Sequence, residues 1–220
     1  MEVNDIKTGT TTVGIKIDNA VILAADMRAS MGHIAYDEES KKIYKITDNL
    51  AVTNAGNVGD SLTIIRFLRS QANLYELERE SKFTAKAAVT LLSNVLNSNR
   101  YYPFIAQFII GGMNSTSELY EISPYGGILE RKNYAATGSG TELALITLDH
   151  GFKENMNEDE AIKLAIKAIE AGKSRDIYSG GKSVSVTVID NSGVRVLDKN
   201  DVDRAKETEL PINTKNKSKK

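Results

Sequence analysis

The chain has 220 residues, of which 28 are basic and 29 acidic, so its formal net charge is −1. This balance excludes a global field that attracts nucleic acid or anionic lipid, and a hydrophobic fraction of 41% excludes a disordered chain. The absence of cysteine excludes disulfides, thiolate nucleophiles and zinc sites built on sulfur. With only two histidines, His33 and His150, we expect no metal and no cofactor, and catalysis must rest on hydroxyl, carboxylate, amine or backbone groups.

The first half of the chain opens with strands and continues with helices. Segments Thr12–Ile17 and Ala20–Ala25 flank a short Asp18-Asn19 turn, a pattern typical of a hairpin, and further strands are predicted at Lys42–Ile46 and Leu50–Thr53. After glycines 56 and 59, apolar residues recur at helical spacing from 62 to 77, and a second helix is predicted after a threonine N-cap at 84.

The second half repeats this block order. Strands are predicted at Phe104–Ile110, Leu119–Ile122 and Ile128–Ala136, one helix after Gly140 and another after an N-cap at Asn157. Strands at 183–189 and 194–197 and a short helix from residue 200 complete the chain, and the polar, lysine-rich tail 211–220 is predicted to be flexible. Strands and helices in blocks favour antiparallel sheets covered by helix pairs, an α+β fold in a single domain, over a parallel βαβ sheet.

No stretch of the sequence predicts a membrane or export signal. The apolar runs fall far short of the ~20 residues of a spanning helix, and residues 1–9 contain no apolar core of a signal peptide. We therefore expect a cytoplasmic protein with no membrane and no nucleic-acid partner.

Two local motifs allow both a chemical and a structural interpretation. Gly181-Lys182-Ser183 ends like a phosphate-binding loop, but Asp176 stands where that motif requires glycine, and a strand rather than a helix follows, so we reject nucleotide binding. Asp26 ends an apolar strand, where a carboxylate needs a partner or water, and Lys42 at the start of another strand is a candidate partner. A solvated strand end explains either residue taken singly.

The sequence Gly9-Thr10-Thr11-Thr12-Val13-Gly14 is the sharpest local feature. Threonine is a good strand residue, so this segment is consistent with an ordinary strand. The functional alternative is cleavage after Gly9, which exposes Thr10 as a new N-terminus. A free α-amine has a reference pKa of about 8 and can take the proton of the Thr10 hydroxyl, so such an enzyme needs neither histidine nor cysteine.

An ordered series of motifs across nearly all of the chain resembles the β subunits of the 20S proteasome, and most closely the archaeal type. The series begins with the leader that ends at Gly9 and the threonine run after it. It continues with Asp26 and Arg28, Lys41-Lys42, Ala55-Gly56, Gly59-Asp60, Gly111-Gly112, Thr137-Gly138-Ser139-Gly140, Ser174-Arg175-Asp176 and Ser179-Gly180-Gly181.

The resemblance implies a four-layer α-β-β-α sandwich of two antiparallel sheets, the N-terminal nucleophile hydrolase fold. It implies that residues 1–9 are a propeptide removed by autocleavage between Gly9 and Thr10, and that residues 10–210 form one catalytic domain. Thr10 matches the nucleophile whose α-amine acts as base, Lys42 the lysine beside the hydroxyl, and Asp26 the carboxylate that holds this lysine.

The remaining site residues are also assigned by the resemblance. Gly56 matches the residue whose backbone N–H binds the oxyanion. Three further residues match the group that fixes the new N-terminus by hydrogen bonds: Ser139, Asp176 and Ser179. Three others match positions in the pocket for the side chain before the cut: Ala29, Asn54 and Val58. Asn54 is a polar residue for a pocket that favours large apolar side chains.

The same resemblance implies a threonine endopeptidase that acts without ATP inside a closed chamber. Seven β subunits would form a ring, two such rings would stack, and α-subunit rings would flank them, while a separate ATPase delivers unfolded polypeptide. Two alternatives stay open. One is another self-activating N-terminal nucleophile amidohydrolase that acts on a small amide, and the other is a catalytically silent β subunit that only builds the ring.

Overall fold

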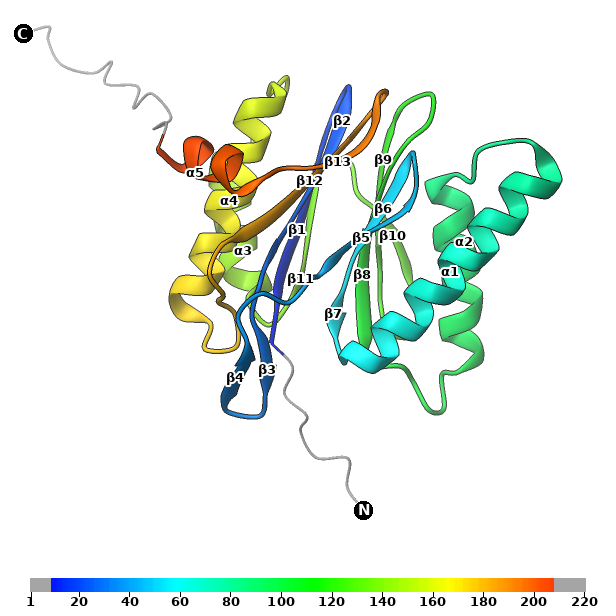
Figure 1. Ribbon diagram of the computed structural model, residues 1–220, viewed down its shortest axis with the longest axis horizontal. Coiled ribbons are helices and arrows are strands. Elements are labelled where there is room, and N and C mark those ends of the chain that lie inside the picture. Colours follow the sequence, from blue (N-terminus) through cyan, green and yellow to red (C-terminus); the bar gives the residue numbers. More distant parts are fainter. Residues whose placement is uncertain (1–8, 208–220) are drawn as a thin grey trace, which may run out of the picture.

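The computed structural model describes residues 9–207. Two β-sheets face each other in the centre, and a helix pair covers the outer side of each sheet, which gives four layers in the order α-β-β-α (Figure 1). The predicted propeptide, apart from Gly9, and the predicted lysine-rich tail lie outside the described residues. The predicted α+β sandwich of two antiparallel sheets is confirmed.

The first sheet has five strands in the order β11-β1-β2-β12-β13, and every neighbouring pair is antiparallel. The strands are β1 (Thr11–Ile17), β2 (Ala20–Asp26), β11 (Tyr134–Gly138), β12 (Val184–Asp190) and β13 (Gly193–Val196). β1 begins at the end of the sheet where β2 and β11 both finish, because Thr11 is paired with Gly138 and Thr12 with Ala25.

The second sheet follows the order β10-β9-β8-β6-β5, and a short strand, β7, pairs with β8 beyond the end of β6. The strands are β5 (Ile43–Thr47), β6 (Leu50–Thr53), β7 (Ala55–Gly56), β8 (Ala106–Met113), β9 (Ser117–Ile122) and β10 (Ile128–Glu130). A separate two-stranded hairpin is formed by β3 (Ala29–Met31) and β4 (Ile34–Asp37).

Helices α1 (Val58–Arg79) and α2 (Ala85–Ser98) cover the second sheet, and α3 (Thr141–Gly151) and α4 (Glu158–Arg175) cover the first, with α5 (Lys199–Glu207) beside α4 (Figure 1). The predicted N-caps are confirmed, because the Thr84 side chain accepts from Ala87 N and Asn157 forms a capping box with Glu160. Across residues 9–207, none of the helices combines the length and apolar character that crossing a membrane requires.

The strand β2 shows how the sequence builds the layers. All seven of its residues are buried, because one face meets the helices and the other meets the second sheet. Ile22 and Ala24 pack in the core under α3 and α4, whereas Val21 and Leu23 belong to the core between the sheets. The near-continuous apolar run in the sequence is therefore a strand buried on both faces.

One predicted strand is wrong. The segment Ile128–Ala136 is divided between the two sheets: Ile128–Glu130 pairs with β9, and Tyr134–Gly138 pairs with β1. The connection is fixed where it crosses, because Arg131 N–H donates to Leu119 O at 2.8 Å and its guanidinium pairs with Glu121 at 2.6 Å. Periodicity along the chain cannot show such a change of sheet, since both pieces have strand character.

The sequence pattern also missed the β3–β4 hairpin. Its residues Met31, Ile34 and Tyr36 are exposed by 57%, 63% and 72%. Because neither strand buries a face, the alternation of buried and exposed residues that marks a strand is absent. The hairpin places Ala29 at the rim of the site described below.

Candidate active site

Thr10 lies at the entrance to β1 and is only 5% exposed. Its hydroxyl donates to the carbonyl oxygen of Gly9 at 2.6 Å, and its backbone N–H donates to Ser139 Oγ at 3.1 Å. A Cβ atom at position 9 would lie 1.6 Å from Tyr178 Cβ. The residue before Thr10 must therefore be glycine in this arrangement of the backbone.

Asp26 and Lys42 form a buried ion pair beneath Thr10. Lys42 Nζ lies 2.6 Å from Asp26 Oδ1, and the side chains are 6% and 0% exposed. Asp26 Oδ1 also accepts Thr11 N–H at 2.9 Å, while Oδ2 accepts Gly180 N–H at 2.9 Å and Arg28 N–H at 3.2 Å. Four donors thus replace the water that the carboxylate loses on burial. The partnership of Asp26 with Lys42 that the sequence suggested is confirmed.

The pKa of Lys42 is lowered from its ordinary value of 10.5. Burial is the dominant cause, since a low-dielectric environment disfavours the charged amine. The negative charge of Asp26 and its hydrogen bond raise the pKa and offset part of this effect, and the more remote Asp176 acts in the same direction.

A chain of hydroxyl and carboxylate groups holds the other side of Thr10. Ser139 Oγ donates to Asp176 Oδ2 at 2.5 Å, and Ser179 Oγ donates to the same oxygen at 2.6 Å. Thr11 Oγ1 lies 2.7 Å from Ser179 Oγ, so the network returns to β1 one residue after Thr10. Ser139 thus contacts Thr10 directly, and Asp176 and Ser179 are joined to Ser139 through the shared carboxylate oxygen.

The turn around Gly56 requires glycine. Gly56 has φ +121°, and a Cβ atom there would lie 2.2 Å from Ile105 O. Two backbone hydrogen bonds of Ile105 hold this turn in place. The Ile105 carbonyl accepts Asn57 N–H at 2.7 Å, and the Ile105 N–H donates to Asp60 Oδ2 at 2.9 Å. Asn57 then caps α1, so Gly56 sits at the positive end of this helix.

A pocket brings these groups together at one end of the sheets. It lies beside Thr10 and is lined by Gly9, Thr10, Arg28, Ala29, Ser30, Ser40, Lys41, Lys42, Asn54, Gly56 and Val58. The structure therefore places every residue predicted for the nucleophile, the lysine, the oxyanion group and the side-chain pocket at one site. The other predicted residues reach it through the hydrogen bonds described above.

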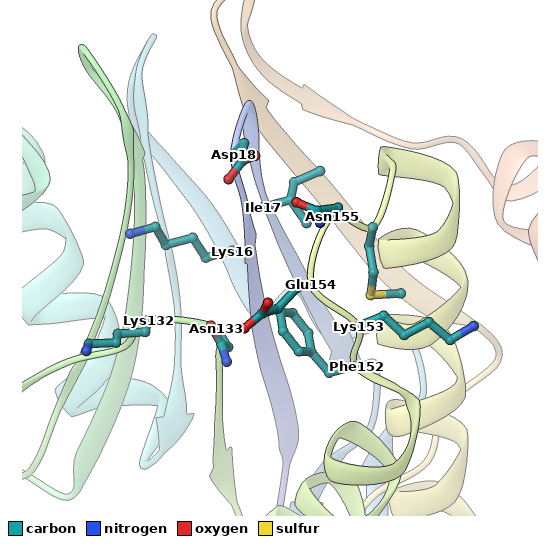
Figure 2. Close-up of a pocket in the computed structure, with 10 residues that line it drawn as sticks. Lys16, Ile17, Asp18, Lys132, Asn133, Phe152, Lys153, Glu154 and Asn155 are labelled. Atoms are coloured by element: carbon teal, nitrogen blue, oxygen red, sulfur yellow. The ribbon is translucent and has the colours of Figure 1, made fainter.

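A second pocket lies at the opposite end of β1 and has a different character. Figure 2 shows the side chains of Lys16 and Lys132 on one side of it and Lys153 pointing away on the other. None of its ten lining residues carries a hydroxyl or a thiol, so it offers no group of the kind that Thr10 supplies at the first pocket. His33 and His150 are both exposed and line neither pocket.

Within residues 9–207, no group of three or more histidine, cysteine or acidic side chains is arranged to hold a metal ion. The polar residues that line the first pocket include the hydroxyl residues Thr10, Ser30 and Ser40, the buried lysine Lys42 and the guanidinium residue Arg28.

The comparisons with known proteins agree with this geometry. The family model described as "Proteasome subunit" matches residues 6–189, which is most of the chain. The chain belongs to the proteasome subunit family. It is 45% identical over 202 residues to proteasome subunit beta of Methanocaldococcus fervens, covering 91% of this chain and 90% of the relative. It is 47% identical over 189 residues to proteasome subunit beta 1 of Pyrococcus horikoshii, covering 86% and 95%.

The sequence did not predict the contacts of three residues in the site. Thr11 ties β1 to both Asp26 and Ser179, Tyr178 excludes any side chain at position 9, and Asp60 anchors the backbone of Ile105. Strand alternation could have indicated that the Thr11 side chain points to the opposite face of the sheet from the side chains of Thr10 and Thr12. The contacts of Tyr178 and Asp60 depend on long-range packing that no local pattern encodes.

The buried Lys42 should give the fold a distinct pH dependence. Between the lowered pKa of Lys42 and its value in the unfolded chain, the unfolded state binds more protons, so the free energy of unfolding should rise with pH. Lys42→Met should abolish this rise and destabilise the fold by about 3–5 kcal/mol near pH 7, because Asp26 loses its buried partner. Denaturant unfolding measured from about pH 7 to about pH 10 tests this.

Lys41→Met is the matched control, since Lys41 is the adjacent lysine and its side chain is exposed. It should change the free energy of unfolding by less than about 0.5 kcal/mol and leave the pH-dependent rise intact. An equal rise in the Lys42→Met variant would contradict the assignment of this effect to Lys42.

Proposed function

We propose that the chain is a catalytic β subunit of the 20S proteasome core, a threonine endopeptidase whose nucleophile is Thr10. The observation that carries the proposal is the convergence at Thr10 of a buried lysine–carboxylate pair and a serine–aspartate network. The relatives are named as proteasome β subunits, which supports the same role. Residues 10–210 would form the catalytic domain after removal of residues 1–9.

The proposed reaction uses the α-amine that cleavage at Gly9 creates. The hydroxyl oxygen of Thr10 attacks the carbonyl carbon of a peptide bond, and the free amine of Thr10 takes the hydroxyl proton. That proton passes to the departing amine of the substrate, which leaves an ester on Thr10. Water then hydrolyses the ester and regenerates the hydroxyl. An α-amine has a reference pKa of about 8, which suits a base near neutral pH.

Lys42 and Asp26 would act electrostatically on the nucleophile. Lys42 lines the same pocket as Thr10, and its ammonium group would stabilise the negative charge that develops on the Thr10 hydroxyl oxygen. Asp26 holds the ammonium at 2.6 Å and balances its charge. Ser139, Asp176 and Ser179 would hold the new N-terminus, since Ser139 already accepts the Thr10 N–H before cleavage.

The backbone N–H of Gly56 would bind the oxyanion that forms on the substrate carbonyl. Gly56 lies next to the N-cap of α1, where the helix dipole also favours negative charge. The missing side chain lets the turn approach the backbone of Ile105 closely, and this contact fixes the orientation of the turn before the substrate binds.

The leader would be removed by the same nucleophile. In the structure the Thr10 hydroxyl donates to the Gly9 carbonyl oxygen, so the nucleophile already adjoins the carbonyl group that it must attack. Cleavage after assembly would confine proteolysis to a closed chamber. We propose that this chamber consists of two stacked seven-membered β rings flanked by α rings, in the cytoplasm, with a separate ATPase delivering unfolded polypeptide.

Removal of the Thr10 hydroxyl tests the proposal. Thr10→Ala should retain residues 1–9 and lose peptidase activity by more than about 1,000-fold, because both reactions use this hydroxyl. Thr10→Ser keeps the hydroxyl and should keep measurable processing and activity. The measurements are the intact mass of the assembled subunit and the hydrolysis of a fluorogenic peptide.

The same measurements separate the alternatives. A subunit that assembles, still starts at Met1 and is inactive would indicate a silent ring builder. Efficient processing of the Thr10→Ala variant would contradict the proposed mechanism. A processed protein that hydrolyses small amides but no peptide would indicate another N-terminal nucleophile amidohydrolase.

The glycine before Thr10 should be required for maturation. Gly9→Ala introduces a Cβ atom at the position 1.6 Å from Tyr178 Cβ, so the backbone must move and the scissile carbonyl leaves its place beside the hydroxyl. We expect processing to slow by at least about 10-fold, as a misplacement of about 1 Å at a reacting centre does. Time courses of subunit mass report it.

A chain that is synthesised to begin at Thr10 is the control, since it has no residue 9. It should be fully active whether or not the Gly9→Ala variant is processed. Processing of Gly9→Ala at the normal rate would show that the close contact with Tyr178 has no role in maturation.

Ala29, Asn54 and Val58 would line the pocket for the side chain before the cut. Asn54 is 6% exposed and makes the lining polar. Asn54→Leu should raise kcat/KM for a substrate with leucine before the cut, relative to one with glutamine, by about 10-fold, a typical effect of apolar complementarity. The ratio of the two kcat/KM values measures it. An unchanged ratio would place the side-chain pocket elsewhere, and Ser30→Ala at the same rim is the control.

A further inference from the structure

Three buried threonine hydroxyls link the two sheets next to the candidate active site. Thr12 Oγ1 of β1 lies 2.7 Å from Thr137 Oγ1 of β11 and 3.2 Å from Thr53 Oγ1 of β6. The three residues are 0%, 3% and 0% exposed, respectively. The hydroxyl groups therefore form a polar connection across a space that is otherwise filled by apolar side chains such as Leu23 and Ile109.

The Thr53 hydroxyl has a second role in the backbone of its own sheet. The pairing of β6 with β8 ends at Val52, which is paired with Ile110, and the pairing of β7 with β8 begins at Ala55, which is paired with Gln107. Two residues on each strand span the break, so the register is kept across it. Inside this break Ile109 N–H donates to Thr53 Oγ1 at 3.2 Å. The hydroxyl thus serves as acceptor where the strand ladder is interrupted.

The position of this link in the chain connects it to the reacting groups. Thr12 follows Thr10 by two residues on β1, and Thr53 precedes Gly56 by three residues. Between Thr53 and Gly56, the chain leaves β6 and forms β7, and Asn54 N–H donates to Lys42 O at 2.9 Å. The Thr12–Thr53 contact therefore fastens the strand that carries the nucleophile to the strand that leads into the glycine turn.

We infer that Thr53 is a positioning residue that, through its hydroxyl contacts with Thr12 and the Ile109 N–H, sets the separation between the Thr10 hydroxyl and the Gly56 N–H. The inference rests on the function proposed above. Removal of the hydroxyl leaves the Ile109 N–H without its partner and cuts the link between the sheets. The turn then shifts relative to Thr10, and transition-state stabilisation falls more than substrate binding does.

Thr53→Val tests the inference, because valine keeps the branched shape and removes the hydroxyl. We expect kcat per titrated active site to fall by about 10-fold, less than the 10²–10³ that loss of an oxyanion donor costs, with KM changed less than about twofold. The dissociation constant of a peptide aldehyde, whose hemiacetal oxygen occupies the oxyanion position, should rise by a similar factor. Thr53→Ser restores the hydroxyl and should restore kcat to within about threefold of the original protein.

Thr187→Val is the matched control. Thr187 is 2% exposed, and its hydroxyl has no hydrogen-bond partner, so the same substitution removes a buried hydroxyl that links nothing. It should leave kcat and aldehyde binding unchanged. If Thr53→Val behaves like Thr187→Val, the inference is overturned.

Two further measurements keep the inference testable. If Thr53→Val does not assemble, Thr12→Val cuts the same link from the other sheet and must lower kcat to a similar extent; a normal kcat refutes the link. Hydrogen exchange in residues 54–57 and at Ile109 should accelerate in Thr53→Val but not in Thr187→Val. Hydrogen exchange can be measured whether or not the protein is active, so the two failures can be told apart. An inactive original protein would refute the proposed function, and unchanged exchange in Thr53→Val would refute the inference.

Discussion

The carboxylate of Asp26 is the group on which the arrangement of the site depends. It lies at the end of β2 with no exposure to solvent, and its two oxygens accept from Lys42, Thr11, Gly180 and Arg28. These donors come from four separate segments of the chain. A buried carboxylate is tolerated only when such partners are present, so burial of this one side chain forces the start of β1, the segment before β5 and the loop after α4 to meet.

Glycine supplies the other constraint, because the backbone approaches other groups closely at several points around Thr10. At Gly138 an added Cβ atom would lie 2.0 Å from Thr10 O, and at Gly140 and Gly172 it would lie 2.0 Å and 2.4 Å from Thr11 Oγ1. Glycines from β11, from the N-terminus of α3 and from α4 therefore surround Thr10 and Thr11. The site is built by bringing backbones together, so side chains with hydroxyl groups can reach one another over short distances.

Much of the fold followed from local patterns in the sequence. The apolar runs, the turn residues and the two N-caps predicted the block order and the antiparallel sheets, since burial and capping act over a few residues. For Asp26 the local pattern offered Lys42 only as a candidate partner beside a solvated strand end, and the specific pairing came from the resemblance to a family. The division of Ile128–Ala136 between two sheets did not follow from local patterns, because strand propensity carries no information about which sheet a strand joins.

The assignment of Ser139 and Asp176 to the site required the resemblance to a family. Ser139 is 129 residues from Thr10 in the chain, and no periodicity encodes a contact at that separation. The Thr12–Thr53 link is of the same kind: three threonines in strands are ordinary by propensity, and only the stacking of the two sheets shows that their hydroxyls meet. What local patterns leave undetermined is therefore which distant segments meet, both at the end of the first sheet and between the two sheets.

The peptide bond between Gly9 and Thr10 gives the proposed chemistry its control. When the base is the α-amine of the nucleophile itself, the Gly9–Thr10 peptide bond keeps the site inactive toward substrates, since an amide nitrogen does not accept a proton near neutral pH. The supporting groups are nevertheless already in place: the Thr10 N–H contacts Ser139, Ser139 contacts Asp176, and Lys42 contacts Asp26. Cleavage would then change the charge and basicity of one nitrogen within a hydrogen-bond network that already exists. An enzyme of this design needs no histidine and no cysteine, and the scarcity of both in the sequence is consistent with it.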